Sequence, residues 1–320
     1  MDLSIVISLL NEEESLRELT EWIHDSISTS HIKDIEYEII FINDGSTDNS
    51  WNVISEMAKS DSHIKAIAFR RNYGKAAALH TGFAKAEGNV IITMDADLQD
   101  SPEEIPELYR MIVEDGWDIV SGWKKKRYDN VLMKNIPSKL YNWTARKVSG
   151  LKLHDMNCGL KAYRKDVVKD IELYGDMHRY VPFIAKNAGY TRITEKVVIH
   201  RKRKYGHSKF GLDRFVHGLL DLMTLWFLGK FGKKPMHVFG FGGLLAFFIG
   251  IILTLIIITT KLVAQSKGLP FRPVADQPLF YIALVTLILG FQMFLTGFLG
   301  ELVSRSSQNR NEYKIKDAIR

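Results

Sequence analysis

VIITMDADLQD, residues 90–100, joins an uncharged segment to an acidic one. Its first part, VIITM (90–94), is rich in β-branched residues and predicts a buried strand. Asp95 and Asp97 follow at once, and alternate residues at a strand end can project to different sides of a site. Hard oxygen ligands of this kind favour Mg²⁺ or Mn²⁺. A lone Asp-x-Asp triplet is often only an acidic loop, but its place at a strand end, with Gln99 nearby, favours a metal site.

Strand and helix patterns alternate on both sides of this segment. Because this alternation is typical of a mostly parallel sheet with helices on both faces, we predict an α/β fold. Ligands of such sheets gather at the carboxyl ends of the strands, where Asn11-Glu12 and Asp44 also lie. The sequence contains no GxGxxG or GxxxxGK[ST] motif, which argues against dinucleotide and P-loop sites. The predicted strands are 3–10, 37–43, 64–69, 90–94 and 118–123, and helices are expected from Asn11-Glu12, after Ser46, over 75–86 and from Ser101.

The composition is that of a globular protein with an uneven distribution of charge. The 320 residues suggest about two domains, and 46% hydrophobic with 25% charged residues excludes a disordered or fibrous chain. A single cysteine, Cys158, excludes a disulfide framework and a cysteine-rich zinc site, and fits a reducing compartment. The net charge of +6 is compatible with nucleic acid, membrane or phosphate ligands, so the location of the charges has to decide.

Two uncharged segments near the C-terminus, 238–260 and 279–300, predict a transmembrane hairpin. Each exceeds the ~20 residues that cross the hydrocarbon layer, although a buried helix pair in a soluble protein has the same pattern. Basic residues flank the pair on its outer ends, so the positive-inside rule predicts a cytoplasmic N-terminal domain and a cytoplasmic tail, 305–320. The first predicted strand begins at residue 3, so that no signal peptide is expected before it, and this agrees with the predicted orientation.

The segment between the two parts, residues 208–234, has one apolar face interrupted by charges. It predicts an interfacial amphipathic helix, and a helix packed on the soluble domain remains an alternative. In the first span, Gly242, Ala246 and Gly250 recur at a spacing of four and predict a close helix contact. We therefore divide the chain into a soluble domain (1–207), the interfacial segment (208–234), two spans (235–304) and a tail (305–320).

Five motifs in order give the chain a family resemblance. It resembles family 2 glycosyltransferases with the nucleotide-sugar-binding, GT-A-like fold, and among them the polyprenyl-phosphate glycosyltransferases. It departs from them at Ser8, where the family usually has proline, and at Leu160, where an aromatic residue is usual. The motifs are ISLLNEEE, FINDGSTDNS, MDADLQDSPEEIP, DMNCGLKAYRKDV and RKYGHSKFG.

The resemblance implies an inverting transfer of one sugar from a nucleoside-diphosphate sugar to polyprenyl (undecaprenyl) phosphate. It implies a metal-dependent enzyme that uses Mg²⁺ or Mn²⁺ at the cytoplasmic face of the inner membrane. The bilayer is then a partner, nucleic acid is not, and a homo-oligomer is left open. These motifs do not indicate which sugar is transferred, or whether its nucleotide is UDP or GDP.

For the donor side, the resemblance implies that Glu12 and Asp44 contact the nucleoside and that Lys75 lies by the nucleotide. Asp95 faces the ribose and the metal region, and Asp97, a catalytic residue, holds the cation with Gln99. From the residues alone, Glu12 is also explained as a helix N-terminal charge, and Asp44 as a turn residue.

For the acceptor side, the resemblance places Asp155 near the lipid phosphate, as a base or as a positioning residue. A phosphate monoester is already anionic at neutral pH, so a base is scarcely needed. Basic groups are expected to bind the phosphate or the lipid head groups, although a solvated face or a membrane anchor also explains them. These groups are Lys124, Arg127, Arg203 and Lys209, together with the hydroxyl of Ser208. Arg203, Ser208 and Lys209 belong to one loop, which is suited to a diphosphate or a lipid phosphate.

Two other functions use a similar sequence. A processive polysaccharide synthase shares the catalytic domain, but it needs more spans and a QxxRW motif, and the sequence has neither. A non-catalytic membrane scaffold or lipid-binding protein is the second alternative, and it would bind neither nucleotide nor metal.

Overall fold

A computed structural model of the chain describes residues 1–125, 149–173, 177–205, 235–270 and 272–306, with residues 146, 175, 223, 224 and 227. The chain divides into an α/β unit within Met1–Trp226 and a helical unit within Phe227–Arg320. The division falls inside the predicted interfacial segment. That segment lies almost entirely outside the described residues, as do Arg127, Ser208, Lys209 and most of the predicted tail.

The α/β unit is built on a seven-stranded sheet with the order β3-β2-β1-β4-β6-β5-β7. Strands β1 to β4 are parallel to one another, β7 is parallel to β5, and β6 runs antiparallel to both β4 and β5. This confirms the mostly parallel sheet, and adds two strands that the sequence pattern did not predict, β6 and β7. The strands are β1 (Leu3–Leu9), β2 (Tyr37–Asn43), β3 (Ile64–Ala68), β4 (Val90–Asp95), β5 (Ile119–Trp123), β6 (Lys161–Arg164) and β7 (Ile193–Val197).

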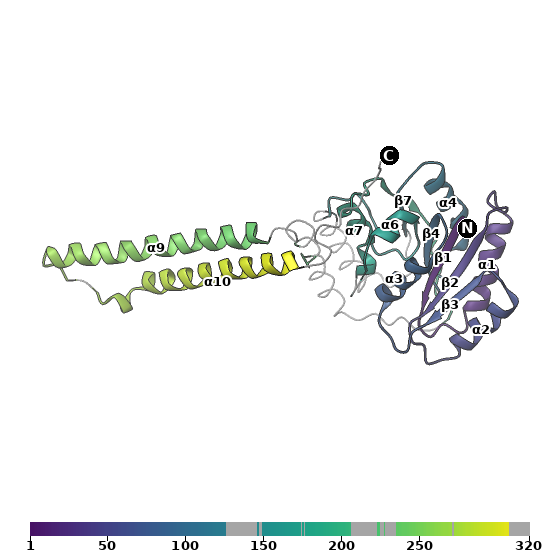
Figure 1. Cartoon of the computed structure of the whole chain (residues 1–320), viewed down its shortest axis with the longest axis horizontal. Helices are drawn as coiled ribbons and strands as arrows, with labels where there is room; N and C mark the ends of the chain where they lie inside the picture. Colours follow the sequence, from purple (N-terminus) through teal and green to yellow (C-terminus); the bar gives the residue numbers. More distant parts are fainter. Residues whose placement is uncertain are drawn as a thin grey trace. The chain divides into compact units, whose positions relative to one another are not determined.

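Helices cover both faces of this sheet (Figure 1). Alternation along β1 sends Leu3, Ile5 and Ile7 into one apolar core and Val6 into the other. The first core packs against α1 (Leu16–Ser28), α2 (Ser50–Ser60) and α4 (Ile105–Val113), and the 3₁₀ turn η1 (Pro102–Glu104) contacts α1. The second packs against α3 (Lys75–Lys85), α6 (Lys165–Asp170), the 3₁₀ turn η2 (Met177–Arg179) and α7 (Val181–Asn187).

The order of the strands determines where a ligand can bind. From β1 the chain passes to β2 and β3 on one side of the sheet, and then returns to place β4 on the other side of β1. Loops from adjacent strands therefore diverge at the carboxyl ends of β1 and β4, which is where open parallel sheets bind ligands. Asn11, Glu12, Asp44 and Asp95 all lie at this edge, as the sequence predicted.

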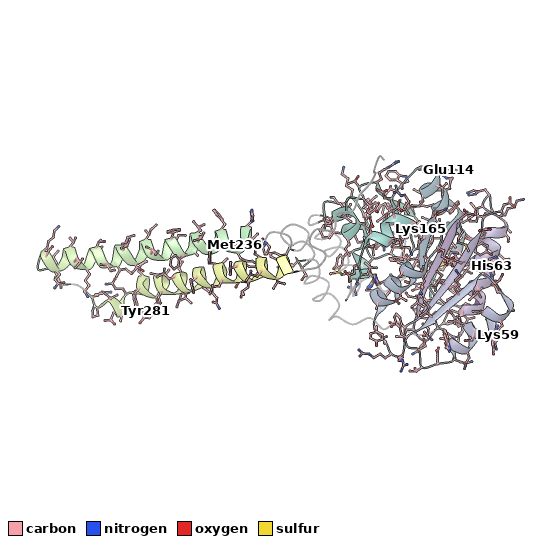
Figure 2. All side chains as sticks on the ribbon, in the orientation of Figure 1. Lys59, His63, Glu114, Lys165, Met236 and Tyr281 are labelled. Atoms are coloured by element: carbon pink, nitrogen blue, oxygen red, sulfur yellow. The ribbon has the colours of Figure 1, made fainter. Side chains whose placement is uncertain are left out.

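The helical unit consists of two long antiparallel helices, α9 (Met236–Ser266) and α10 (Pro278–Ser306), with the 3₁₀ turn η3 (Val274–Asp276) between them. Both are long and apolar enough to cross a membrane. Figure 2 shows their side chains, from Met236 in α9 to Tyr281 in α10, projecting outward along the pair. Most large apolar side chains of the pair are exposed, which suits a lipid environment better than water.

The helices approach most closely at glycines. A Cβ on Gly243 would lie 2.7 Å from the carbonyl oxygen of Gly290, and a Cβ on Gly250 would lie 2.9 Å from the backbone nitrogen of Leu287. Of the predicted contact face, Gly250 lies at this contact with α10, whereas a Cβ on Gly242 would meet only the flexible end of Met293. The residue next to it, Gly243, makes the contact because it lies seven positions, about two helical turns, before Gly250.

Candidate active site

The loop after β1 is held against the loop after β2. Asn11 has a left-handed backbone, with φ of 56°, which Asn tolerates better than most residues. Its backbone N–H donates to Ser46 Oγ at 2.9 Å, and its side-chain oxygen accepts from the backbone N–H of Thr47 at 2.8 Å. Because residues 11–15 form this loop, α1 begins at Leu16 and not at Asn11. The loop presents Glu12 at the carboxyl edge of the sheet.

Asp44 holds the segment that leads into α3. Its carboxylate is buried and accepts backbone N–H bonds from Tyr73 at 2.7 Å and from Gly74 at 3.0 Å. Burial raises the pKa of this carboxyl, and the two hydrogen bonds only partly offset the rise. A side chain at Gly45, where φ is 73°, would collide with the backbone of Arg71, so this approach requires glycine. The structure thus shows Asp44 positioning a loop, a role that the sequence did not predict.

Lys75, the first residue of α3, forms an ion pair with Asp95, the last residue of β4. Burial raises the pKa of the Asp95 carboxyl, but the ammonium groups of Lys75 and Lys124 outweigh burial and hold the pKa well below its ordinary value. Gly159 also lies against this carboxylate, and a Cβ there would be 2.6 Å from Asp95 Oδ2. Asp95 is therefore ionised and is confined between a cation and a glycine.

Asp97 forms an ion pair with an arginine from a distant part of the chain. The guanidinium of Arg203 donates to Asp97 Oδ2 at 2.6 Å and approaches Glu12 Oε1 at 3.4 Å. Burial raises the pKa of Asp97, the charge of Asp95 raises it further, and Arg203 lowers it. The net direction is upward, and burial is the largest cause. The structure joins Glu12, Asp97 and Arg203, three residues that the sequence singled out separately.

The loop that carries these carboxylates has a constrained backbone. Leu98 has φ of 59°, a left-handed conformation that is unusual for leucine, and its side chain is buried in the core beneath the sheet edge. The backbone N–H of Gln99 donates to Asp97 Oδ1 at 3.2 Å, and the Gln99 side-chain amide donates to the carbonyl oxygen of Arg201 at 3.3 Å. Gln99 thus joins the acidic loop to the segment after β7 that contains Arg203.

Lys124 lies inside the protein and not on its surface. Its side chain is 13% exposed and forms a 2.7 Å ion pair with the fully buried Asp100. Burial alone lowers the pKa of Lys124, but Asp100 outweighs it and raises the pKa above its ordinary value. This pairing favours a structural role for Lys124 over the lipid-phosphate binding that we expected.

Asp155 is also buried, at 2% exposure, and its Oδ1 accepts the backbone N–H of Asn157 at 3.1 Å. Near it lies Lys161, the first residue of β6, which is 3% exposed and donates to the carbonyl oxygen of Cys158. Burial lowers the pKa of Lys161, and it raises the pKa of the Cys158 thiol to about 12, so that Cys158 is not a nucleophile. The sequence analysis did not single out Lys161, which lies in the quoted motif DMNCGLKAYRKDV.

The donor set fits a divalent cation. Two carboxylates, from Asp95 and Asp97, and the side-chain oxygen of Gln99 belong to one loop at the strand end. The carboxylate of Asp97 is buried, and the charge of Asp95 adds to burial in raising its pKa. Oxygen-only ligands suit Mg²⁺ or Mn²⁺ and do not suit a thiophilic metal.

Comparison with known proteins identifies related sequences over most of the chain. The family model described as "Glycosyl transferase family 2" matches residues 4–172. A dodecaprenyl-phosphate galacturonate synthase of Rhizobium johnstonii is 32% identical over 309 residues, covering 96% of this chain and 88% of that protein. An undecaprenyl-phosphate 4-deoxy-4-formamido-L-arabinose transferase of Proteus mirabilis is 33% identical, covering 94% of this chain and 88% of that protein.

Solved structures share the fold at low sequence identity. Glucosyl-3-phosphoglycerate synthase of Mycobacterium tuberculosis in complex with UDP has a TM-score of 0.53 and 17% identity, covering 71% of this chain and 79% of that chain. Its complex with Mn²⁺, UDP and phosphoglyceric acid has a TM-score of 0.52 and 16% identity, covering 71% of this chain and 78% of that chain. At this identity the similarity extends to the fold alone.

Proposed function

Because the chain belongs to glycosyl transferase family 2, we propose that it transfers one sugar from a nucleoside-diphosphate sugar to a polyprenyl phosphate. Two observations support the acceptor class. Both relatives described above are named for a polyprenyl phosphate, and their similarity extends through the helical unit as well as the α/β unit. The two apolar helices, α9 and α10, fit an enzyme whose acceptor is held in a membrane.

The observation that carries the proposal is the position of Arg203. Its guanidinium lies 2.6 Å from Asp97, beside the carboxylates that fit a divalent cation, and Lys75 pairs with Asp95 on the other side of the same loop. Cations on either side of a carboxylate pair are suited to a diphosphate, because they balance the charge that grows on the leaving group. A scaffold protein has no need of such an arrangement.

On this proposal Asp95, Asp97 and Gln99 hold Mg²⁺ or Mn²⁺. When bound, the ion supplies positive charge to the donor diphosphate. The neighbouring residues have separate tasks. Asp44 fixes the 70–74 segment through two backbone N–H groups and so sets the position of Lys75. Glu12, at the same sheet edge, is placed to contact the nucleoside.

The chemistry needs little help from a base. An oxygen of the acceptor phosphate attacks the anomeric carbon of the sugar while the bond to the nucleoside diphosphate breaks, and the configuration inverts. The acceptor oxygen is already anionic at neutral pH, so positioning matters more than proton removal. Buried Asp155, which binds the backbone of Asn157, suits the role of ordering the 155–161 segment better than the role of a base.

The proposal extends to location and to the residues outside the described part of the chain. The basic residues that flank the two spans in the sequence support a multi-pass protein of the inner membrane with the α/β unit in the cytoplasm. Arg127, Ser208 and Lys209 remain proposed contacts of the lipid phosphate. A homo-oligomer is compatible with this function and is not required by it.

The experiment that tests the function uses the full chain, purified in detergent, with Mn²⁺ and undecaprenyl phosphate. UDP- and GDP-sugars are supplied one at a time, and the lipid product is analysed by mass spectrometry. We expect a product that carries a single sugar. A polymer ladder would instead identify a processive synthase, and failure to bind any nucleotide with or without Mn²⁺ would identify a scaffold.

A further inference from the structure

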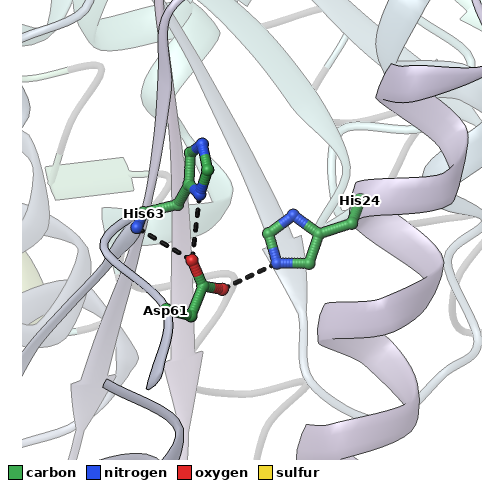
Figure 3. Close-up of side chains that lie close together, drawn as sticks. All are labelled: His24, Asp61 and His63. Carbon is green, nitrogen blue, oxygen red and sulfur yellow. Dashed lines mark hydrogen bonds and ion pairs between the residues drawn. The ribbon is translucent and has the colours of Figure 1, made fainter. Parts of the chain in front are cut away.

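A second group of metal-binding side chains lies at the opposite edge of the sheet. His24 projects from α1, Asp61 follows the end of α2, and His63 immediately precedes β3 (Figure 3). They lie at the amino ends of β2 and β3, whereas the candidate active site lies at the carboxyl ends. At about 3.3 Å per residue, the seven residues of β2 separate the two edges by roughly 20 Å. The two groups therefore cannot share one ion.

Both histidine rings face the same carboxylate. His24 Nε2 lies 2.7 Å from Asp61 Oδ2, and His63 Nδ1 lies 2.9 Å from Asp61 Oδ1. One ligand atom from each residue can be chosen so that all three lie within 4.8 Å of one another. Ligands about 2.0–2.2 Å from a tetrahedral ion are separated by about 3.4 Å, between the shortest contacts here and the 4.8 Å limit. Small rotations of the side chains are enough to enclose an ion.

The surroundings hold two of these groups in place. The backbone N–H of His63 donates to Asp61 Oδ1 at 2.9 Å, which fixes the carboxylate. The ring of Tyr37 stacks on the ring of His63 with centroids 4.4 Å apart. The carboxylate and one imidazole are thus oriented in advance, as ligands of structural metal sites usually are.

The Tyr37 hydroxyl lies 2.5 Å from His24 Nδ1, on the far side of that ring from Asp61. A hydroxyl can donate or accept, so it fits either tautomer of the imidazole. A metal-bound neutral His24 keeps its proton on Nδ1 and donates it to Tyr37. His63, whose side chain is 43% exposed, can donate its Nε2 proton to water. Both rings can therefore bind a metal while they remain neutral and hydrogen-bonded.

We propose that His24, Asp61 and His63 form a structural Zn²⁺ site, with water as the fourth ligand on the exposed side. Two imidazoles and one carboxylate suit Zn²⁺, whereas Mg²⁺ and Mn²⁺ prefer oxygen ligands alone. The ion joins α1 to the connection between α2 and β3, so that bound Zn²⁺ stabilises the folded α/β unit by mass action.

The test measures Zn²⁺ binding to the full chain in detergent by calorimetry, with millimolar Mg²⁺ present to compete at the carboxylate site. We expect one equivalent with a dissociation constant of about 1 μM or tighter. Co²⁺ in place of Zn²⁺ should give the visible absorption of a tetrahedral site. His63→Ala should weaken Zn²⁺ binding at least about a hundredfold, because it removes a direct ligand and even outer partners contribute about 10–100-fold.

Tyr37→Phe is the decisive variant, because it keeps the ring stacked on His63 and removes only the hydroxyl. It should weaken Zn²⁺ binding about 10–100-fold. His80→Ala, at an exposed histidine of α3, and Asp97→Asn, in the other site, should leave Zn²⁺ binding unchanged. The proposal is wrong if the wild-type chain does not bind Zn²⁺ with a dissociation constant near 1 μM or tighter. It is also wrong if Tyr37→Phe and His63→Ala bind Zn²⁺ as the wild type does, or if Asp97→Asn abolishes Zn²⁺ binding. His24, Asp61 and His63 would then form only a hydrogen-bonded link between elements.

Discussion

Gly159 is the position at which a small change should most specifically disturb the candidate active site. In Gly159→Ala the new Cβ would lie 2.6 Å from Asp95 Oδ2 and 2.9 Å from Asp95 Oδ1, whereas ordinary contact begins at 3.4 Å. The Asp95 carboxylate must then move by about 0.8 Å, the difference between 3.4 and 2.6 Å, away from its position beside Lys75. A misplacement near 1 Å in a catalytic site can cost about 10²-fold in rate.

We therefore expect Gly159→Ala to reduce turnover about 10–100-fold at saturating donor, with a midpoint of thermal unfolding close to that of the wild type. The assay follows transfer of a radiolabelled sugar to a short-chain polyprenyl phosphate. Donor binding is measured in parallel by calorimetry. Unchanged turnover, within about threefold, would show that the 159 backbone yields and that Asp95 is not confined as described.

A double-mutant cycle separates this cause from general damage. Asp95→Ala removes the carboxylate that the new methyl group displaces, so Gly159→Ala should weaken donor binding in the wild type and have almost no further effect in the Asp95→Ala background. Additive losses in the two backgrounds would mean that the methyl group acts through something other than Asp95, and the reasoning would fail.

Four further predictions concern the candidate active site, the core and the helix pair. Asp97→Asn should lower turnover about 10²–10³-fold, and more than about a tenth of the activity retained at saturating Mn²⁺ would contradict a metal-binding role. Because the pKa of Asp97 is raised, protonation should weaken metal-dependent nucleotide binding as the pH falls, starting at a higher pH than for an ordinary aspartate; calorimetry over a pH series would show it. Glu38 is buried, and its carboxylate accepts a hydrogen bond from Ser4 Oγ at 2.5 Å. Burial raises the pKa of Glu38, but the hydrogen bonds and the charge of Lys65 together outweigh burial and lower it. The contribution of ionised Glu38 to folding stability is therefore complete above the ordinary glutamate pKa and is lost as the pH falls through the lowered value. Glu38→Gln should destabilise the fold at neutral pH by about 1.5–3 kcal/mol, with exposed Glu36→Gln as the control in thermal unfolding. Gly290→Ala would place a Cβ 2.5 Å from the Phe247 backbone nitrogen and should loosen the helix pair in detergent, whereas Gly242→Ala, which meets only a methionine methyl, should not; equal effects would contradict the contact.

The sequence predicted the central strands well because burial determines their residues. Strands β1, β2 and β4 are apolar runs enclosed on both faces, and their observed bounds differ from the predicted ones by at most a residue. The strands that were missed have another character. β6 has only four residues and begins with a buried lysine, and β7, ITEKV, is polar and half-buried. Such strands are stabilised by their neighbours, and their own residues give no clear periodic pattern.

In the candidate site, the sequence predicted which residues gather and not how they pair. Asp97, Glu12 and Arg203 were each expected near the ligand, but the pairing of Arg203 with Asp97 joins residues 106 positions apart. Likewise, no local sequence pattern indicates that Asp44 accepts hydrogen bonds from the backbone N–H groups of residues 73 and 74. Nor does one indicate that Lys124 forms an ion pair with Asp100. These contacts depend on the packing of loops from different strands, which the spacing of residues along the chain does not encode.

The left-handed backbone of Leu98 has a thermodynamic consequence for donor binding. A non-glycine residue in this conformation costs about 1–2 kcal/mol, and burial of a leucine side chain returns about 1.5–3 kcal/mol. The loop that carries Asp95 and Asp97 is thus held in shape by the hydrophobic core, into which Leu98 is anchored. Its conformational entropy is lost when the chain folds, before any donor arrives. Binding therefore does not have to include the ordering of this loop, and more of the contact free energy remains as affinity.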